Sequence, residues 1–115
     1  MSDKTLEMTM LLDFYGELLT EKQRTCFSLH YNDDYSLAEI AEEQGISRQG
    51  ARDLIVRAEA TLRETEQRLG FVARHLERRA ALSDMEKLLL ELEGLCSGRA
   101  KELTGALLDK MNTLD

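Results

Sequence analysis

The sequence has no proline and no tryptophan, and it contains only two cysteines. Because proline is the residue that breaks helices most strongly, its absence leaves long helices possible along the whole chain. The cysteines, Cys26 and Cys96, are far apart and stand among apolar positions, which favours buried reduced thiols over a disulfide. We assign neither cysteine a function.

Long apolar runs are also missing. No stretch approaches the ~18 residues that a membrane span needs, and the first residues lack the basic and apolar regions of a signal peptide. We therefore expect a cytoplasmic protein with no membrane partner.

No part of the chain is basic, and the net charge is −7. Residues 1–35 hold three basic and seven acidic residues, residues 36–69 five and seven, and residues 70–115 seven and eight. Since affinity for nucleic-acid phosphates comes mostly from Lys and Arg, this balance argues against strong non-specific binding. Binding to DNA would have to depend on local geometry.

The residues that are present favour helices. Hydrophobic residues make up 43% and charged residues 32% of the chain, with many Leu, Ala, Glu and Arg, which lose little rotamer freedom in a helix. The chain is long enough for one modest domain. We predict an all-α protein in which a helix-turn-helix domain (1–70) precedes a C-terminal helical extension (71–115).

The first 31 residues predict two helices. In residues 5–19, Leu6, Met10, Phe14 and Leu18 recur every four positions. Further apolar residues flank them, which indicates a mostly buried first helix: Met8, Leu11, Leu12, Tyr15 and Leu19. A capping-box pattern from Thr20 to Gln23 then starts a second helix, which carries Phe27, Leu29 and Tyr31 inward and ends at residues 32–34.

The next segment has the spacing of a helix-turn-helix. Ser36, with Glu39 three residues later, caps a helix over residues 37–44, and Gly45 ends it. Only Ile46 separates this glycine from Ser47, which caps the following helix. Such a short connection is typical of the turn between the two helices of the motif.

The helix that begins at Arg48 carries apolar or small residues at spacings of three and four. These are Ile55, Ala58, Leu62, Thr65, Leu69, Val72 and Leu76. We expect this helix to continue to Arg79, because a glycine costs a helix only about 1 kcal/mol relative to alanine. A break near Gly70 is the alternative.

Two apolar stripes follow in the C-terminal region. Another capping-box pattern at Ser83 predicts the start of a helix with the stripe Met85, Leu88, Leu92 and Leu95. The last helix, over residues 99–112, carries the stripe Ala100, Leu103, Leu107, Met111 and Leu114. We favour packing of the seam that begins at Ile55 and the leucine stripe that begins at Met85 on each other within one chain over a homodimer through either of them, but both remain open.

These motifs carry a resemblance to a known family. Residues 35–49 resemble the helix-turn-helix of bacterial sigma region 4, and residues 11–24 and 33–36 are similar to the YlxM family. The resemblance covers about residues 5–70. It implies a sigma-region-4-like module, and members of that family are regarded as DNA-binding or regulatory proteins linked by gene neighbourhood to the signal recognition particle pathway.

A helix that enters a major groove presents its N-terminal side chains to the bases. The candidates for this contact are Ser47, Arg48, Gln49, Arg52 and Asp53, and the candidates for phosphate contacts are Lys22, Arg24 and Arg57. Alternatively, the arginines form a solvated face paired with acidic neighbours, which contributes little to stability. The sequence supports the two interpretations about equally.

No pattern indicates catalysis. His30 and His75 have no partner at metal-ligand spacing, and no nucleophile motif or phosphate-binding glycine loop is present. We expect a protein that is not an enzyme and uses no cofactor and no metal.

Two functions follow. The first is a regulator that binds double-stranded DNA, with a homodimer compensating for weak binding by one copy. The alternative is an adaptor that binds the GTPases of the signal recognition particle pathway through an acidic surface or the C-terminal helices.

Overall fold

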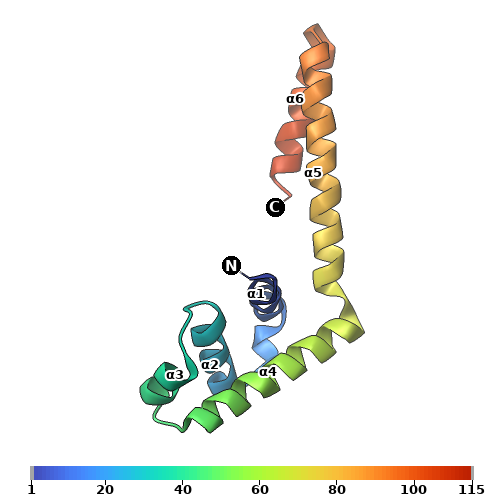
Figure 1. The fold of residues 1–115 in the computed structure, drawn as a ribbon. Helices are drawn as coiled ribbons and strands as arrows, with labels where there is room; N and C mark the ends of the chain where they lie inside the picture. The colour runs from blue at the N-terminus through green and yellow to red at the C-terminus, as the bar shows by residue number, and fades with distance from the viewer. Residues whose placement is uncertain (1, 115) are drawn as a thin grey trace. The chain divides into compact units, whose positions relative to one another are not determined.

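A computed structural model describes residues 2–114 (Figure 1). Within these residues the chain forms helices and no strand. The elements are α1 (Asp3–Tyr15), the 3-10 turn η1 (Gly16–Leu18), α2 (Glu21–Tyr31), α3 (Leu37–Gln44), α4 (Arg48–Leu69), α5 (Phe71–Leu95) and α6 (Gly98–Asn112). The predicted all-α, helix-turn-helix class is confirmed. One compact unit extends to Val72, and a second begins at Ala73. None of the helices in residues 2–114 combines the length and the hydropathy that crossing a bilayer requires.

Local capping sets the starts of α2 and α3 as predicted. The Thr20 hydroxyl accepts a hydrogen bond from the Gln23 backbone N–H at 3.2 Å, and the Gln23 side chain accepts one from the Thr20 N–H at 3.0 Å. Ser36 and Glu39 exchange the same pair of bonds at 3.1 and 3.0 Å. Each cap satisfies backbone donors that a helix start leaves open, which contributes about 1 kcal/mol.

The core of the first unit lies along α4. Ala51, Ile55, Ala58 and Leu62 are buried at spacings of four, three and four, so they form one stripe. The helices α1, α2 and α3 all contact α4 (Figure 1). They contribute the buried residues Met8, Leu11, Tyr15, Cys26, Phe27, Ile40 and Ala41. The first half of the predicted apolar stripe on α4 is therefore the core of this unit.

The prediction of a mostly buried first helix is correct for only one side of α1. Met8, Leu11 and Tyr15 are buried, whereas Leu6, Phe14 and Leu18 of the four-residue repeat are exposed. A spacing of four residues turns about 40° further around the helix at each step, whereas the spacings 8–11–15 keep to one side. The helix also ends at Tyr15, because the chain tightens there into η1.

The predicted continuation of α4 to Arg79 is also wrong, and the alternative break at Gly70 is correct. Gly70 has φ 65°, a left-handed conformation that ends a helix at little cost for glycine. The N–H of Phe71 donates to the Tyr15 hydroxyl at 3.2 Å, and that of Val72 donates to the Glu66 carboxylate at 3.0 Å. Tyr15 in turn donates to Glu66 at 2.6 Å. Because these contacts satisfy the first donors of α5, the chain can start a new helix immediately.

The capping box predicted at Ser83 does not form, since α5 runs through this residue without interruption. The preceding residues Ala80, Ala81 and Leu82 are strong helix formers, so no break exists for Ser83 to cap. The predicted packing of the seam against the leucine stripe does not form, because Ile55, Ala58 and Leu62 are buried in the core of the first unit whereas Met85, Leu88, Leu92 and Leu95 are exposed. Both cysteines are free thiols, but only Cys26 is buried, because Cys96 lies between α5 and α6.

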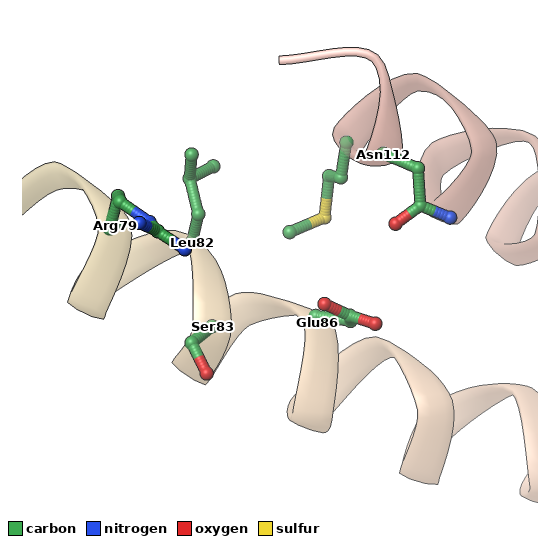
Figure 2. A pocket seen from close by; sticks show the side chains of 6 residues that line it. Arg79, Leu82, Ser83, Glu86 and Asn112 are labelled. Carbon is green, nitrogen blue, oxygen red and sulfur yellow. The ribbon is translucent and has the colours of Figure 1, made fainter. Parts of the chain in front are cut away.

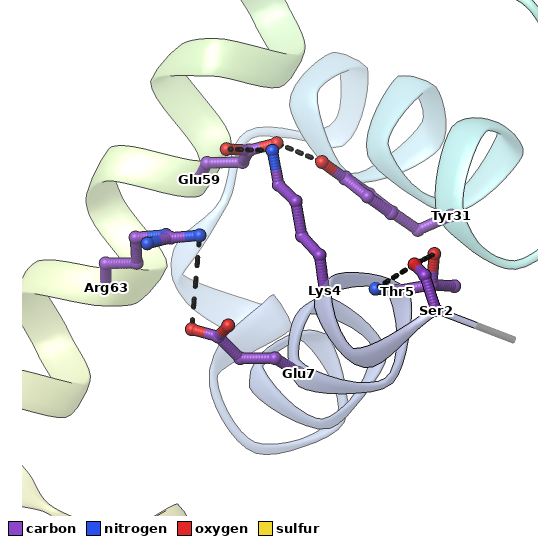
Figure 3. A network of polar contacts seen from close by, with 7 residues as sticks. All are labelled: Ser2, Lys4, Thr5, Glu7, Tyr31, Glu59 and Arg63. Atoms are coloured by element: carbon purple, nitrogen blue, oxygen red, sulfur yellow. Dashed lines mark hydrogen bonds and ion pairs between the residues drawn. The ribbon is translucent and has the colours of Figure 1, made fainter.

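A polar network joins α1, α2 and α4 at one side of the core (Figure 3). The Tyr31 hydroxyl donates to the Glu59 carboxylate, which also lies 3.7 Å from the Lys4 ammonium group. Glu7 of α1 lies 4.0 Å from Arg63 of α4. Burial, followed by the bond to Glu59, raises the pKa of Tyr31.

The substitution Tyr15→Phe tests the junction after Gly70. It removes the acceptor of the Phe71 N–H and the donor to Glu66, so we expect a loss of about 2 kcal/mol in the free energy of unfolding measured with urea. Combining it with Glu66→Gln should cost less than the sum of the two single changes, because both act on one network. If the costs of the two changes simply added, Tyr15 and Glu66 would not act as one network.

The pKa of Tyr31 predicts a pH dependence. Because folding raises this pKa above its ordinary value of 10.0, the contribution to stability is complete below pH 10 and falls as the pH rises further. The free energy of unfolding, followed between pH 9 and pH 11, should therefore decline more steeply in the parent protein than in Tyr31→Phe. Equal slopes would show that this hydroxyl has no such role.

Candidate nucleic-acid interface

The turn between α3 and α4 fixes where α4 begins. Gly45 ends α3 with φ 67°, and the N–H of Ile46 donates back to the Ala41 carbonyl at 3.0 Å. Ser47 then caps α4 by accepting the Gly50 N–H at 2.9 Å. The side chain of Ile46 is half-buried against the core, which anchors the turn. The N-terminal turns of α4 are thereby held as one end of a rigid helix.

The candidate base-reading side chains lie on one exposed face of α4. Arg48, Gln49, Arg52 and Asp53 are all exposed and fall within about 140° around the helix. The middle of this range lies about 120° from the middle of the buried stripe. The Gln49 amide nitrogen donates to the Asp53 carboxylate at 2.9 Å. This bond orients the Gln49 amide and leaves its oxygen and its second hydrogen available to a ligand.

Two of the three candidate phosphate contacts lie beside this face. Lys22 and Arg57 line a shallow hollow of about 320 Å³ with Ile46, Gly50, Asp53 and Leu54. Arg24 does not join them. Its side chain lies 3.9 Å from the place where a Cβ on Gly16 would stand, and two residues along a helix differ by about 200° in direction.

The acidic residues of α4 are mostly held away from this face. Glu59 accepts from Tyr31, Glu66 accepts from Tyr15, and Glu64 pairs with Arg68 at 3.0 Å. Asp53 is the only acidic residue of α4 between Arg48 and Arg57, and it lines the hollow together with Lys22 and Arg57. Five arginines and four acidic residues nearly balance along the α4 sequence, but three of the four carboxylates bind groups away from the start of the helix.

The acidic residues of α3 are partly occupied as well. The Glu39 carboxylate accepts the Ser36 N–H, and this hydrogen bond lowers the pKa of Glu39. The charge of Glu43 raises the pKa of the neighbouring Tyr35 hydroxyl. Glu42 and Glu43 remain exposed, so α3 presents fewer free carboxylates than its sequence suggests.

Sequence reasoning missed Val56, which is 49% exposed. Four residues after Arg52 and seven after Gln49, it lies in the middle of the same face. The signal was an apolar residue that falls outside the buried stripe of α4 and among arginines.

Within residues 2–114, no three His, Cys, Asp or Glu side chains come together as metal ligands would.

Comparisons with known proteins agree with the helix-turn-helix arrangement of α3 and α4. The profile of a family described as "Putative helix-turn-helix protein, YlxM / p13 like" matches residues 2–97. A UPF0122 protein of Shouchella clausii is 44% identical over all 115 residues, which is the full length of both chains. One from Symbiobacterium thermophilum is 50% identical over 82 residues, or 71% of this chain and 77% of its own. The family is described by its motif and not by an enzymatic activity.

Substitutions of Gly45 test the turn. Nothing lies within 4 Å of a Cβ placed there, so Gly45→Ala should destabilise the protein by about 1 kcal/mol through the left-handed backbone alone. Gly45→Asn is the matched control and should cost less, because asparagine adopts this conformation more readily. Equal urea midpoints for the two variants would contradict the assignment.

Proposed function

This chain belongs to the YlxM/p13-like helix-turn-helix family, and from this premise we propose that it is a regulatory protein that binds double-stranded DNA. The N-terminal turns of α4 enter the major groove, which is wide enough to admit a helix. The observation that carries the proposal is the exposed N-terminal part of α4, where Arg48, Arg52 and Arg57 accompany a single acidic residue, Asp53, although the chain as a whole is acidic. Lys22 and Arg57 share a hollow with this carboxylate.

Each side chain on this face has a base-edge chemistry. Arg48 and Arg52 offer paired donors that match guanine, and Gln49 offers the acceptor and donor that match adenine. Asp53 holds the Gln49 amide in one orientation, which lowers the entropy lost when the base is bound. Val56 extends the face by one turn and provides an apolar contact for a thymine methyl group.

Phosphate contacts position the helix in the groove. Lys22 and Arg57 lie on one side of the α4 N-terminus, around the hollow that Gly50 also lines. Ser47 and the first N–H groups of α4 complete the contact with a backbone phosphate, because a helix start favours negative charge. Only a few phosphates are neutralised in this way, so binding by one copy is weak and sensitive to salt.

A second candidate function is an adaptor for the GTPases of the signal recognition particle pathway. It is favoured by the charge of residues 1–72, where eight basic residues stand against fourteen acidic ones. A surface of this kind attracts a basic protein partner and repels DNA outside the α4 face. The two functions use different surfaces, so one set of variants separates them.

Joint replacement of Arg48, Gln49 and Arg52 by alanine tests DNA binding. Because each base contact contributes about 1–3 kcal/mol, affinity for selected genomic fragments should fall by at least about 100-fold. Arg68→Ala is the control, since Arg68 is an exposed arginine of the same helix that pairs with Glu64. The folded state should survive in both variants, because exposed substitutions usually change stability by less than about 0.5 kcal/mol.

Binding is measured at two salt concentrations, with the purified GTPases titrated in parallel. Salt-sensitive binding to particular fragments that the triple variant loses supports the DNA-binding function. Equal DNA affinities of the triple variant and the parent protein would reject the groove assignment. A stable GTPase complex without any DNA binding would establish the adaptor in its place.

A further inference from the structure

The C-terminal unit has almost no core of its own. Among the described residues from 73 to 114, Thr104 is the only one that is buried. The unit nevertheless carries many leucines, several of which are about half exposed or more. Apolar side chains in this number normally pack against a partner, because a soluble monomer rarely leaves so much apolar surface in water.

The two helices of this unit form an antiparallel hairpin. A Cβ on Gly105 would lie 3.4 Å from the Glu93 carboxylate, near the connection between α5 and α6. At the other end, Met111 and Asn112 share a hollow of about 200 Å³ with Arg79, Leu82, Ser83 and Glu86 (Figure 2). Contact between the helices is therefore made by one side of each, and the hollow indicates that it is loose.

The exposed apolar residues lie on another side of the hairpin, which we call the leucine face. On α5 it comprises Ala81, Met85, Leu88, Leu92 and Leu95, at spacings of four, three, four and three. On α6 it comprises Ala100, Leu103 and Leu107. This alternation of three and four is the pattern by which helices pack side by side over several turns.

Both stripes turn toward the same side. On each helix, the stripe is displaced by about 110° around the helix axis from the residues that face the other helix. The direction of this displacement is the same on α5 and α6 when each helix is followed from its N-terminus to its C-terminus. In two antiparallel helices, an equal sense of rotation brings the stripes to one common surface. The hairpin is consequently a two-helix layer with one apolar face.

The area of this face suits an interface between proteins. Leu95 is 81% and Leu88 66% exposed, and the other large side chains of the face are about half exposed. Together they offer on the order of 600 Å² of apolar surface, at roughly 100 Å² for each large side chain. A standard-size interface takes about 800 Å² from each partner. The flanking polar residues can supply the difference.

The charge pattern identifies a second copy of the chain as the occupant. Residues 71–79 carry three arginines and one glutamate, whereas residues 84–95 carry four acidic residues and one lysine. Two α5 helices that run antiparallel therefore bring the basic start of each near the acidic end of the other. Residues 73–115 hold seven basic and eight acidic residues, so two such units repel each other little.

We propose that the leucine face joins two copies of this chain, with the α5 helices antiparallel, in a four-helix bundle made by two hairpins. The alternation of apolar residues along α5 and α6 then fills the space between the layers, as in other helical bundles. This dimer goes beyond DNA binding and does not depend on it. Where both occur, each dimer carries two copies of the α4 face and can contact two half-sites.

The test compares Leu88→Asp with Leu90→Asp. Leu90 is 51% exposed but points about 160° away from Leu88, outside the leucine face, so it is a matched control. The mass in solution, measured by light scattering after size exclusion, should be that of a dimer for the parent protein and for Leu90→Asp. It should be that of a monomer for Leu88→Asp, because a carboxylate cannot be buried between apolar layers without a partner.

A milder pair of variants covers the case in which Leu88→Asp fails to fold. Leu92→Ala should raise the dimer dissociation constant at least tenfold in sedimentation equilibrium, whereas Leu90→Ala should leave it unchanged. A parent protein that is monomeric at 100 μM would overturn the proposal. The proposal would also be overturned if Leu88→Asp and Leu90→Asp had the same mass in solution. Equal dissociation constants for Leu92→Ala and Leu90→Ala would overturn it as well.

Discussion

The buried stripe on α4 is the contact on which the first unit depends. Ala51, Ile55, Ala58 and Leu62 are the surface against which α1, α2 and α3 pack, and two of the four are alanines. Small residues let neighbouring helices approach closely, which leaves little space in the core. Since the same helix carries the candidate DNA-binding face at its N-terminus, the packing that holds the fold together also fixes that face.

Charge in this protein has to be considered by position. The glutamates of α4 serve structural contacts: Glu59 binds Tyr31, Glu66 completes the junction after Gly70, and Glu64 pairs on the surface with Arg68. The arginines near the start of the helix have only Asp53 among them. An acidic chain can therefore present a locally cationic face, and weak attraction at long range is compatible with specific contacts at short range.

The two compact units use their apolar residues in opposite ways. In the first, large side chains such as Phe27, Ile40 and Leu62 are fully buried. In the second, two helices alone cannot enclose Leu88 or Leu95, because a layer of two helices always leaves one side open. This difference is the reason why we propose the C-terminal hairpin as a surface for association, whereas the N-terminal unit buries its core within one chain.

The sequence alone determined the features that depend on neighbouring residues. Helix starts at Thr20, Ser36 and Ser47, the turn at Gly45 and the exposure of Arg48 and Gln49 follow from contacts within about four positions, which a linear pattern records. Only the tertiary structure decided which side of α1 is buried, that α4 ends at Gly70, and that the C-terminal stripes face outward. The junction after Gly70 is stabilised by the Tyr15 hydroxyl, which accepts a hydrogen bond from the Phe71 N–H. These two residues are 56 positions apart, and no local sequence pattern contains a partner at that distance.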